Sequence, residues 1–401
     1  MQRTILLLGG ARYALPIIEE AHKLDCKVIT CDYLPNNIAH RYSDGYENVS
    51  IVDKEKVLVT AERLNIDAIM SFACDPGVIT AAYVAEKMGL PNVGPYESVC
   101  VLQNKNRFRK FLQSNGFNVP HSIKANSFEE AIKSIEQFAF PVIVKPTDSA
   151  GSKGVTKVDT VDQLKKAVEF AIDHSIAGEC IIEDFLESKG YPSDSECFSV
   201  GGNLVFDSWS AQHFDRACDN PFTPAGFTWE PSISEANRSE LKTELQRLLY
   251  LLKMQTSIYN VETREATNGK AYIMEVSPRG GGNRLAEMLG YATGVNLIEA
   301  SVKAALGYDI NPKWFEHSLD NKWAEIILHG RKKGLFTGIS ISEKIQKYVV
   351  EKDLWVNVGD IIEDFSGANK AIGTLVMHFD DVDMMNVVMN NPEDFIRIET
   401  K

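Results

Sequence analysis

The sequence predicts a protein of mixed α/β and α+β class, with a helix-covered parallel sheet first, an α+β part in the centre and a small β-rich part last. Strand and helix patterns alternate over the first hundred residues, and short strands alternate with turns from about residue 315 to the end. A chain of 401 residues is also too long for one ordinary core, since domains typically have roughly 100–150 residues.

The N-terminal part, residues 1–97, shows the βαβ rhythm of a parallel sheet. Its strands are "TILLLGG", "KVITCDY" and "DAIMSFA", and "ALPIIEEAHKL" is a helix between the first two. The stretch "GGARYA" does not match the G-x-G-x-x-G fingerprint. We therefore expect a Rossmann-like domain without a nicotinamide cofactor, which disfavours a dinucleotide-dependent oxidoreductase.

Composition limits the kinds of binding partner and the cellular compartment that we expect. The formal net charge of −13 argues against a nucleic-acid partner and against an anionic membrane surface, but not against a small anionic substrate in a local basic pocket. The seven cysteines are scattered without a C-x-x-C pair, which fits free thiols in a reducing compartment. No apolar run approaches the ~20 residues of a membrane span, so we expect a cytoplasmic protein.

The central part begins with a helix that we expect Ser98 to cap and Gly116 to end. Two capping boxes follow, Ser127 with Glu130 and Thr160 with Gln163. Between them lies the strand "FPVIVKP", and "CIIEDFL" is the next strand. The later stretch "SELKTELQRLLYLLKM" has leucines along one face of an amphipathic helix.

Two glutamates form the clearest candidate for a metal site. Asn268-Gly269 is a strong hairpin signal, and a two-residue turn there places Glu262 directly opposite Glu275. Cross-strand partners share one face of the sheet, with Cβ atoms about 5 Å apart. Two carboxylates so placed repel each other unless a cation lies between them or one is protonated, and Mg²⁺ takes one or two carboxylates together with substrate phosphates. The alternative is an ordinary hairpin with one acid in solvent.

Several weaker signals surround this pair. Lys145 ends the strand "FPVIVKP", and the small-residue loop "TDSAGSKGV" after it lets backbone N–H groups approach phosphate oxygens, with Lys153 as an added charge. Lys105 lies forty residues upstream of Lys145, and the strand "IIEDFLE" offers Glu183 as an acceptor for an adenine amine. Taken singly, these signals also fit a strand terminus, a hairpin turn and a solvated helix charge.

Together and in this order, Lys105, "VIVKP", "SAGSKGV", "EDFLE" and "NVETRE…YIMEVSPRGGG" resemble the ATP-grasp superfamily, and within it the carboxylate–amine ligases. The resemblance covers nearly the whole chain. It implies a pre-ATP-grasp domain at 1–97, an ATP-grasp domain at 98–310 with a lid subdomain at about 121–186, and a small C-terminal domain at 311–401.

The resemblance also implies roles for individual residues. It assigns ATP contacts to Lys105, Lys145, Ser149, Gly151, Ser152, Lys153, Gly154, Glu183, Asp184, Phe185 and Leu186, with Asp194 or Glu196 at the ribose. It assigns the Mg²⁺ ligands, with Mn²⁺ as an alternative ion, to Glu262, Glu275 and Ser277. It makes Lys145 and Arg279 the catalytic cations, and lets Gly280, Gly281 and Gly282 admit the acceptor substrate. Ser277 departs from the family's usual asparagine, so a second metal ion would be held more loosely there.

The resemblance implies an ATP-dependent ligase that joins a carboxylate to an amine through an acyl phosphate and releases ADP and phosphate. Its expected substrates are amino-acid-like small molecules. We expect specificity in the segment Gln212–Ser232, which lacks helix or strand periodicity and contains His213 and Arg216. Three alternatives stay open: a purine-pathway enzyme of the phosphoribosylglycinamide synthetase or formate-dependent transformylase kind, a catalytically weak ATP-binding sensor, and the oxidoreductase above. A homodimer is also left open.

Overall fold

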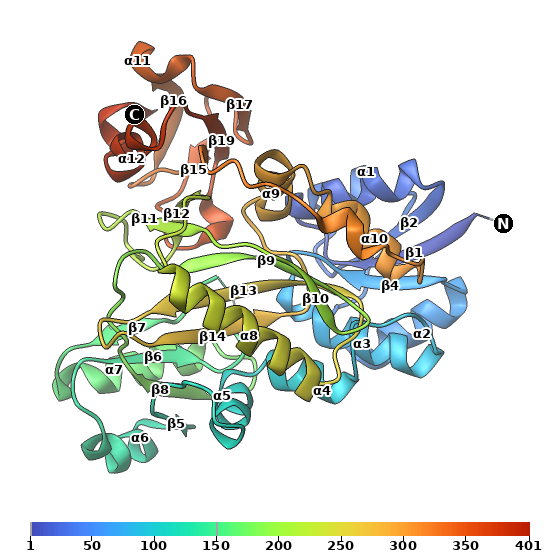
Figure 1. The fold of residues 1–401 in the computed structure, drawn as a ribbon, viewed down its shortest axis with the longest axis horizontal. Helices are drawn as coiled ribbons and strands as arrows, with labels where there is room; N and C mark the ends of the chain where they lie inside the picture. Colours follow the sequence, from blue (N-terminus) through green and yellow to red (C-terminus); the bar gives the residue numbers. More distant parts are fainter. Residues whose placement is uncertain (1, 150) are drawn as a thin grey trace.

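The computed structural model describes residues 2–149 and 151–401, which form five β-sheets with helices packed against them. Figure 1 shows the N-terminal sheet in blue, the central sheet crossing the middle of the molecule, and the C-terminal sheets in red. None of the helices in these ranges combines the length and the apolar character needed to cross a bilayer. The predicted mixture of α/β and α+β parts is confirmed.

The N-terminal sheet is parallel, with strand order β3-β2-β1-β4. Its elements are β1 (Arg3–Leu8), α1 (Leu15–Lys23), β2 (Cys26–Cys31), β3 (Gly45–Glu47), α2 (Lys54–Leu64), β4 (Ala68–Ser71) and α3 (Asp75–Met88). The side chains of Ile5 to Leu8 are fully buried because helices cover both faces of this sheet.

The helix predicted to run from Ser98 to Gly116 is two helices, α4 (Tyr96–Leu102) and α5 (Lys105–Ser114). The single-helix prediction is wrong because Asn104 leaves the helical conformation and caps α5, accepting a hydrogen bond from the N–H of Arg107. This break places Lys105 in the first turn of α5, where its backbone N–H donates to the carbonyl of Thr147.

The four-stranded antiparallel sheet of the predicted lid has the order β5-β8-β6-β7, and it carries its own apolar core. Its elements are β5 (Ser122–Ala125), α6 (Phe128–Ser134), β6 (Val142–Pro146), β7 (Thr156–Val158), α7 (Val161–Asp173) and β8 (Cys180–Asp184). Ser127 caps α6, and the capping box of Thr160 and Gln163 at the start of α7 is confirmed.

The central sheet, of order β10-β9-β13-β14, has one apolar and one polar face. Its elements are β9 (Ser193–Val200), β10 (Asn203–Asp207), α8 (Glu235–Leu251), β13 (Ser257–Glu265) and β14 (Ala271–Ser277). The leucines of α8 pack on the face that carries Cys197, Tyr259 and Val276. The alternate residues therefore point to the other face, where side chains of β9, β13 and β14 form a polar surface.

The β13–β14 hairpin pairs Glu262 with Glu275, as predicted, but its turn and its register near the turn differ from the prediction. Near the turn the register differs by one residue, since Glu265 and not Ala266 lies opposite Ala271. The turn takes three residues, with Gly269 at a φ of +80°, and a bulge between Glu262 and Thr263 then restores the predicted pairing.

The segment predicted as an irregular loop, Gln212–Ser232, contains two strands, β11 (Ala211–Phe214) and β12 (Pro224–Thr228). They join a five-stranded sheet of order β11-β12-β15-β19-β17 with β15 (Trp323–Leu328), β17 (Val349–Leu354) and β19 (Gly373–His378). The loop prediction is wrong because both strands are short and buried within this sheet, which removes the polar alternation that marks a strand.

The remaining C-terminal elements form a small sheet, β18-β16-β20, and two helices. They are β16 (Gly334–Ile341), α11 (Glu343–Gln346), β18 (Ile361–Ile362), α12 (Val382–Asn390) and β20 (Ile396–Thr400). Because β11 and β12 pair with β15, the predicted boundary at 310/311 separates segments of one sheet. The three-part division therefore stays a prediction about folding units.

The loop after β14 joins the central sheet to the N-terminal domain, and its glycines serve this junction. A Cβ at Gly280 would collide with the ring of Phe72, and one at Gly281 would lie 2.7 Å from Asn260 Nδ2 and 2.8 Å from Glu196 Oε1. At Gly282 the nearest atom, in Tyr13, would be 3.6 Å away. Only Gly282 leaves room for a ligand, so the expectation that all three glycines admit substrate is corrected. The loop continues into α9 (Leu285–Thr293) and α10 (Leu297–Ala305).

These glycines give a matched pair of variants. Gly280→Ala should lower the melting temperature, because the added methyl group overpacks Phe72 at a cost of roughly 1–3 kcal/mol. Gly282→Ala is the control and should change the melting temperature little, since its methyl group meets only an ordinary contact. Thermal unfolding followed by circular dichroism measures both, and equal melting temperatures for the two variants would contradict this packing role.

Glu196 gives a pH-dependent prediction. Burial raises its pKa to about 8 from an ordinary 4.5, although it accepts a hydrogen bond from the N–H of Gly281 at 2.6 Å and lies near Arg279. Because the folded chain binds this proton more tightly, the contribution to stability is complete below about pH 4.5 and is lost as the pH rises to about 8. Glu196→Gln should therefore gain stability relative to wild type between pH 5 and pH 8.5 in paired urea titrations. A difference in unfolding free energy between Glu196→Gln and wild type that does not change with pH would contradict a buried, protonated Glu196.

Candidate active site

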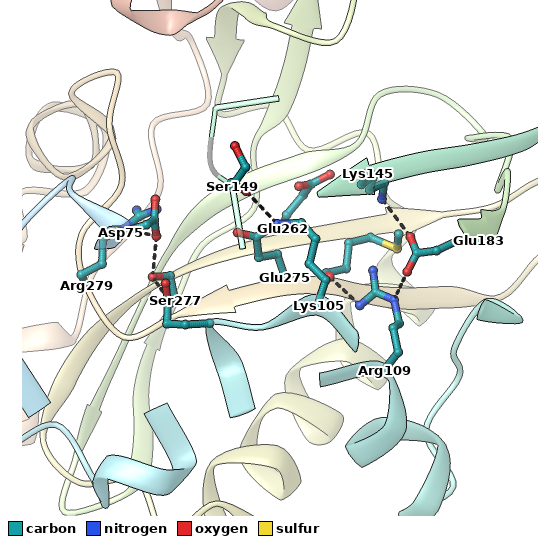
Figure 2. Close-up of polar contacts among 12 residues, drawn as sticks. Asp75, Lys105, Arg109, Lys145, Ser149, Glu183, Glu262, Glu275, Ser277 and Arg279 are labelled. Atoms are coloured by element: carbon teal, nitrogen blue, oxygen red, sulfur yellow. Dashed lines mark hydrogen bonds and ion pairs between the residues drawn. The ribbon is translucent and has the colours of Figure 1, made fainter. Parts of the chain in front are cut away.

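The polar face of the central sheet holds three groups of charged side chains, and Figure 2 shows them side by side. Glu262, Glu275 and Lys105 lie in the middle. Lys145, Glu183 and Arg109 lie at one end, and Arg279, Asp75 and Ser277 lie at the other. In each group an acid and a cation are in contact.

In the middle group, Lys105 offsets the charge of one of the two paired glutamates. Its Nζ lies 3.2 Å from Glu275 Oε2 and donates to the carbonyl of Ser149 at 3.0 Å. Burial would lower the pKa of Lys105, but Glu275 outweighs burial and raises it, so the ammonium stays charged. Glu262 and Glu275 each keep about a third of the side chain exposed, which leaves carboxylate oxygens open to a ligand.

At the lid end, Glu183 is fully buried and holds two cations. It accepts from Arg109 Nε at 2.6 Å and from Lys145 Nζ at 2.9 Å. Burial would raise the pKa of Glu183, yet these two cations lower it to about 2. The Glu183 carboxylate is inaccessible in this geometry, so its bond to adenine stays a prediction. Glu183 positions Lys145.

The predicted adenine hinge, Glu183 to Leu186, lies at the end of β8 and in the residues directly after it. Asp184 is the last residue of β8, and its backbone N–H is already bonded to the carbonyl of His121 at 3.0 Å. The carbonyl of Leu186 accepts from Arg264 Nη1 at 2.9 Å. Phe185 and Leu186 follow the strand and line a cleft of about 1780 Å³. The N–H of Phe185 is also bonded, to the carbonyl of Pro141 at 3.3 Å, so the adenine hinge stays a prediction.

Asp194 and Glu196 lie beside the central group, and Glu196 is fully buried while Asp194 is half-buried. Asp194 lies opposite Glu262 on β13 and accepts from Asn260 Nδ2 at 2.7 Å. Burial and then Glu262 raise its pKa to about 7. Glu196 lies opposite Asn260 and holds Gly281. Both acids therefore lie toward the metal and acceptor ends of the face, which weakens the ribose assignment for either.

The glycine loop assigned to the phosphates, Ser149–Gly154, contains Ala150, which lies outside the described residues. Gly151, Ser152 and Gly154 have positive φ angles of 66°, 58° and 74°. Ser152 Oγ donates to the carbonyl of Phe222 at 2.9 Å, and Asn220 Nδ2 donates to the carbonyl of Ser152 at 3.1 Å. The loop thus contacts the segment between β11 and β12, and the Lys153 side chain is exposed.

At the other end, Arg279 is held by an acid of the N-terminal domain. Its Nη2 donates to both carboxylate oxygens of Asp75 at 2.6 Å, and its Nε donates to Oδ1 at 2.9 Å. Burial would raise the pKa of Asp75, but the guanidinium holds it below its usual range. Ser277 Oγ donates to Asp75 at 3.0 Å and accepts from Gln103 Nε2 at 2.7 Å. Ser277 is thereby turned away from the glutamate pair, and its predicted role as a metal ligand is not supported by this arrangement.

The two predicted specificity residues lie in the large cleft. His213 stacks on Tyr191 with ring centroids 4.2 Å apart, and burial lowers its pKa to about 4, so it is neutral at pH 7. Arg216 is exposed on the cleft wall. The Nε2 of His213 lies 3.4 Å from Thr228 Oγ1, within the same sheet.

Sequence reasoning missed Asp75, Gln103 and Arg109. Asp75 had a usable signal, because it follows the strand "DAIMSFA" and ligand sites lie beyond the carboxyl ends of parallel strands. Arg109 had one too, since it is four residues after Lys105 and so shares its helix face. Gln103 lies in the unexpected break between α4 and α5, so its role depends on a feature that was not foreseen.

The donors on this face fit a magnesium nucleotide. Two carboxylates on adjacent strands, one of them paired with an ammonium, are the oxygen ligands that Mg²⁺ takes in phosphate-transfer sites. Lys105 and Lys145 flank them with charges suited to phosphate oxygens. A nucleotide-bound Mg²⁺ would replace the contact between Lys105 and Glu275.

Comparison with protein families identifies an ATP-grasp domain over residues 138–287. Carbamoyl phosphate synthase large chain of Neisseria meningitidis serogroup A is 25% identical over 221 residues, which is 55% of this chain and 20% of that protein. A formate-dependent phosphoribosylglycinamide formyltransferase of Synechococcus sp. is 27% identical over 187 residues, 46% of this chain and 47% of the relative. The chain thus spans a fifth to a half of these relatives.

Solved structures match the chain over its full length. L-amino acid ligase from Bacillus licheniformis has a TM-score of 0.81 at 20% identity, covering 100% of this chain and 99% of the other. Phosphoribosylglycinamide synthetase from Anaerococcus prevotii has a TM-score of 0.76 at 21% identity and covers 100% of both chains. The chain therefore contains an ATP-grasp domain over residues 138–287, and over its whole length it shares the fold of these solved structures.

Proposed function

We propose that this chain is an ATP-dependent ligase that joins a small-molecule carboxylate to an amine through an acyl phosphate. The observation that carries the proposal is the pairing of Glu262 with Glu275, with Lys105 Nζ 3.2 Å from the second carboxylate. Mg²⁺ bound there, or Mn²⁺ in its place, would hold the β- and γ-phosphates of ATP and neutralise their charge.

The chemistry follows from the poor reactivity of a carboxylate. A carboxylate oxygen attacks the γ-phosphorus and ADP leaves. The amine nitrogen then attacks the acyl carbon, loses a proton, and phosphate leaves. In this scheme Lys105 and Lys145 hold phosphate oxygens, Arg279 neutralises the acyl phosphate, and the lid excludes water that would hydrolyse it.

Each of these cations is paired with an acid in the chain without nucleotide. Lys105 contacts Glu275, Lys145 contacts Glu183, and Arg279 contacts Asp75. The ion pairs keep the long side chains oriented, so less conformational freedom is lost when an anion binds. For Arg279 to meet substrate, Asp75 must share or release it, and a substrate carboxylate is the group that competes for the same guanidinium edge.

We further propose that the substrates are amino-acid-like. The support is the full-length likeness to an L-amino acid ligase.

A phosphoribosylated amine is the second candidate, supported by the likeness to phosphoribosylglycinamide synthetase. It requires a phosphate-binding cation in the N-terminal domain. Arg12 is the residue in position, since it lies over the ring of Trp355 at 5.3 Å, next to Tyr13. Phosphate release from ATP with pairs of amino acids, compared with release with phosphoribosylamine and glycine, separates the two. No release with either set would leave ATP binding without ligase activity.

Lys145→Ala should weaken ATP binding, measured by calorimetry with Mg²⁺ present. The reason is that Lys145 is the cation that Glu183 holds toward the polar face, and its loss removes a charge-assisted bond of about 1.5–3 kcal/mol. Lys166→Ala, an exposed lysine on α7, is the control and should bind ATP normally. Unchanged affinity in Lys145→Ala would remove this lysine from the nucleotide site.

Glu275→Gln should abolish turnover while the fold stays intact, and Glu262→Gln should do the same less completely, because an amide removes the repulsion but binds Mg²⁺ poorly. The increase in melting temperature on adding Mg²⁺ and ATP should be lost in both variants. Glu169→Gln, on the exposed side of α7, should keep both properties. Near-normal ATP-dependent phosphate release in both active-face variants would overturn the two-carboxylate metal site and the mechanism built on it.

A further inference from the structure

A second group of possible metal ligands lies away from the nucleotide face. Asp215, Cys218 and His329 bring a carboxylate oxygen, a sulfur and a ring nitrogen within 4.8 Å of one another. Within residues 2–149 and 151–401, this is the one group of three such side chains found together. Asp215 and Cys218 come from the connection between β11 and β12, and His329 directly follows β15.

The hydrogen bonds of His329 orient its ring so that Nε2 faces Asp215. Its Nδ1 lies 2.7 Å from the carbonyl of Ile327, which can only accept, so Nδ1 carries a proton. Its Nε2 then faces Asp215 Oδ2 at 3.2 Å. The lone pair of Nε2 therefore points toward the carboxylate oxygen, into the space that the three donor side chains share. The ring is also stacked on Phe365, with centroids 4.0 Å apart, which fixes its direction.

A backbone carbonyl that accepts from one ring nitrogen is the usual outer partner of a metal-binding histidine. The other two donors are also preorganised. The backbone N–H of Ala217 donates to Asp215 Oδ1 at 2.9 Å, and that of Cys218 donates to the carbonyl of Asp215 at 3.3 Å. This turn directs the buried Cys218 toward the carboxylate.

The donor set selects the kind of ion. Cysteine, histidine and aspartate together are ligands of Zn²⁺ and similar borderline ions, whereas Mg²⁺ and Ca²⁺ prefer oxygen ligands. Asp215 and His329 also line the large cleft, so water can supply the fourth ligand of a tetrahedral ion.

Arg331 is the competing cation. Its Nε lies 2.6 Å from Asp215 Oδ2 and its Nη2 lies 3.1 Å from Oδ1. Its side chain is 43% exposed, so it can withdraw to solvent or stay on one carboxylate oxygen while the other binds an ion. Without a metal ion, Asp215 and Arg331 form an ion pair beside Cys218 and His329.

We propose that Asp215, Cys218 and His329 bind one divalent ion of the zinc type, which fixes the connection between β11 and β12 to the end of β15. This connection also contacts the glycine loop Ser149–Gly154, because Asn220 Nδ2 donates to the carbonyl of Ser152. The same Nδ2 donates to the carbonyl of Ser366. The ion would therefore fix the position of the connection that contacts the glycine loop. Its site is separate from that of the metal ion bound with the nucleotide.

Cobalt titration of the metal-free full-length chain tests the proposal. Co²⁺ should bind at about one equivalent and give a thiolate-to-metal absorption band in the near ultraviolet together with visible bands of a tetrahedral ion. Cys218→Ser should lose the thiolate band, and both Cys218→Ser and His329→Gln should bind at least about 10–100-fold more weakly. Cys100→Ser, on α4, is the matched control and should behave as wild type.

Thermal unfolding gives an independent readout. Zn²⁺ should raise the melting temperature of the wild-type chain and of Cys100→Ser, but not that of Cys218→Ser. Arg331→Ala should bind Co²⁺ at least as tightly as wild type, because it removes the competing cation. Absence of stoichiometric Co²⁺ binding by the folded wild-type chain, or an unchanged thiolate band in Cys218→Ser, would overturn the proposal and leave the ion pair of Asp215 and Arg331 as the account of these residues.

Discussion

Crowding of negative charge on one face of the central sheet governs the arrangement of the polar residues around it. Asp194, Glu262 and Glu275 lie opposite one another on three adjacent strands, so their repulsion must be offset from outside the sheet. The chain does this with Lys105 from α5 and with protonation, since burial and Glu262 raise the pKa of Asp194 to about 7. The break before α5 therefore matters, because it places Lys105 at the start of that helix, beside Glu275.

The same principle explains the two ends of the face. Glu183 and Asp75 are buried or nearly so, and each is stabilised by a guanidinium, Arg109 and Arg279 respectively. Removing one partner of such a pair would leave an uncompensated buried charge, which is far more costly than losing a surface ion pair. Each acid therefore ties a different structural part to the central face: Glu183 the lid sheet and Asp75 the N-terminal domain.

Patterns with a local physical cause could be predicted from the sequence. The parallel N-terminal sheet, the cap at Ser127, the box at Thr160 and the pairing of Glu262 with Glu275 all follow from short-range preferences. The hairpin pairing was correct although the turn was assigned one residue too short, because the bulge compensates for the longer turn. A sequence shows a turn signal, but it does not show a compensating bulge.

What escaped prediction depends on contacts between distant segments. Asp75 meets Arg279 across 204 residues and Glu183 meets Arg109 across 74, so no local pattern marks either acid as the partner of a cation. The strands β11 and β12 were missed for the same reason, since only pairing with β15, about a hundred residues later, makes them strands.

That pairing has a consequence for how the chain is made. The five-stranded sheet draws its members from residues 211 to 378, so two strands emerge from the ribosome well before the partners that complete their hydrogen bonding. Contacts of such long sequence separation form slowly, because a long loop must close first. Until β15 and β19 are synthesised, β12 has an unpaired edge that another chain could join. A nascent chain paused between these segments is thus the state most exposed to aggregation.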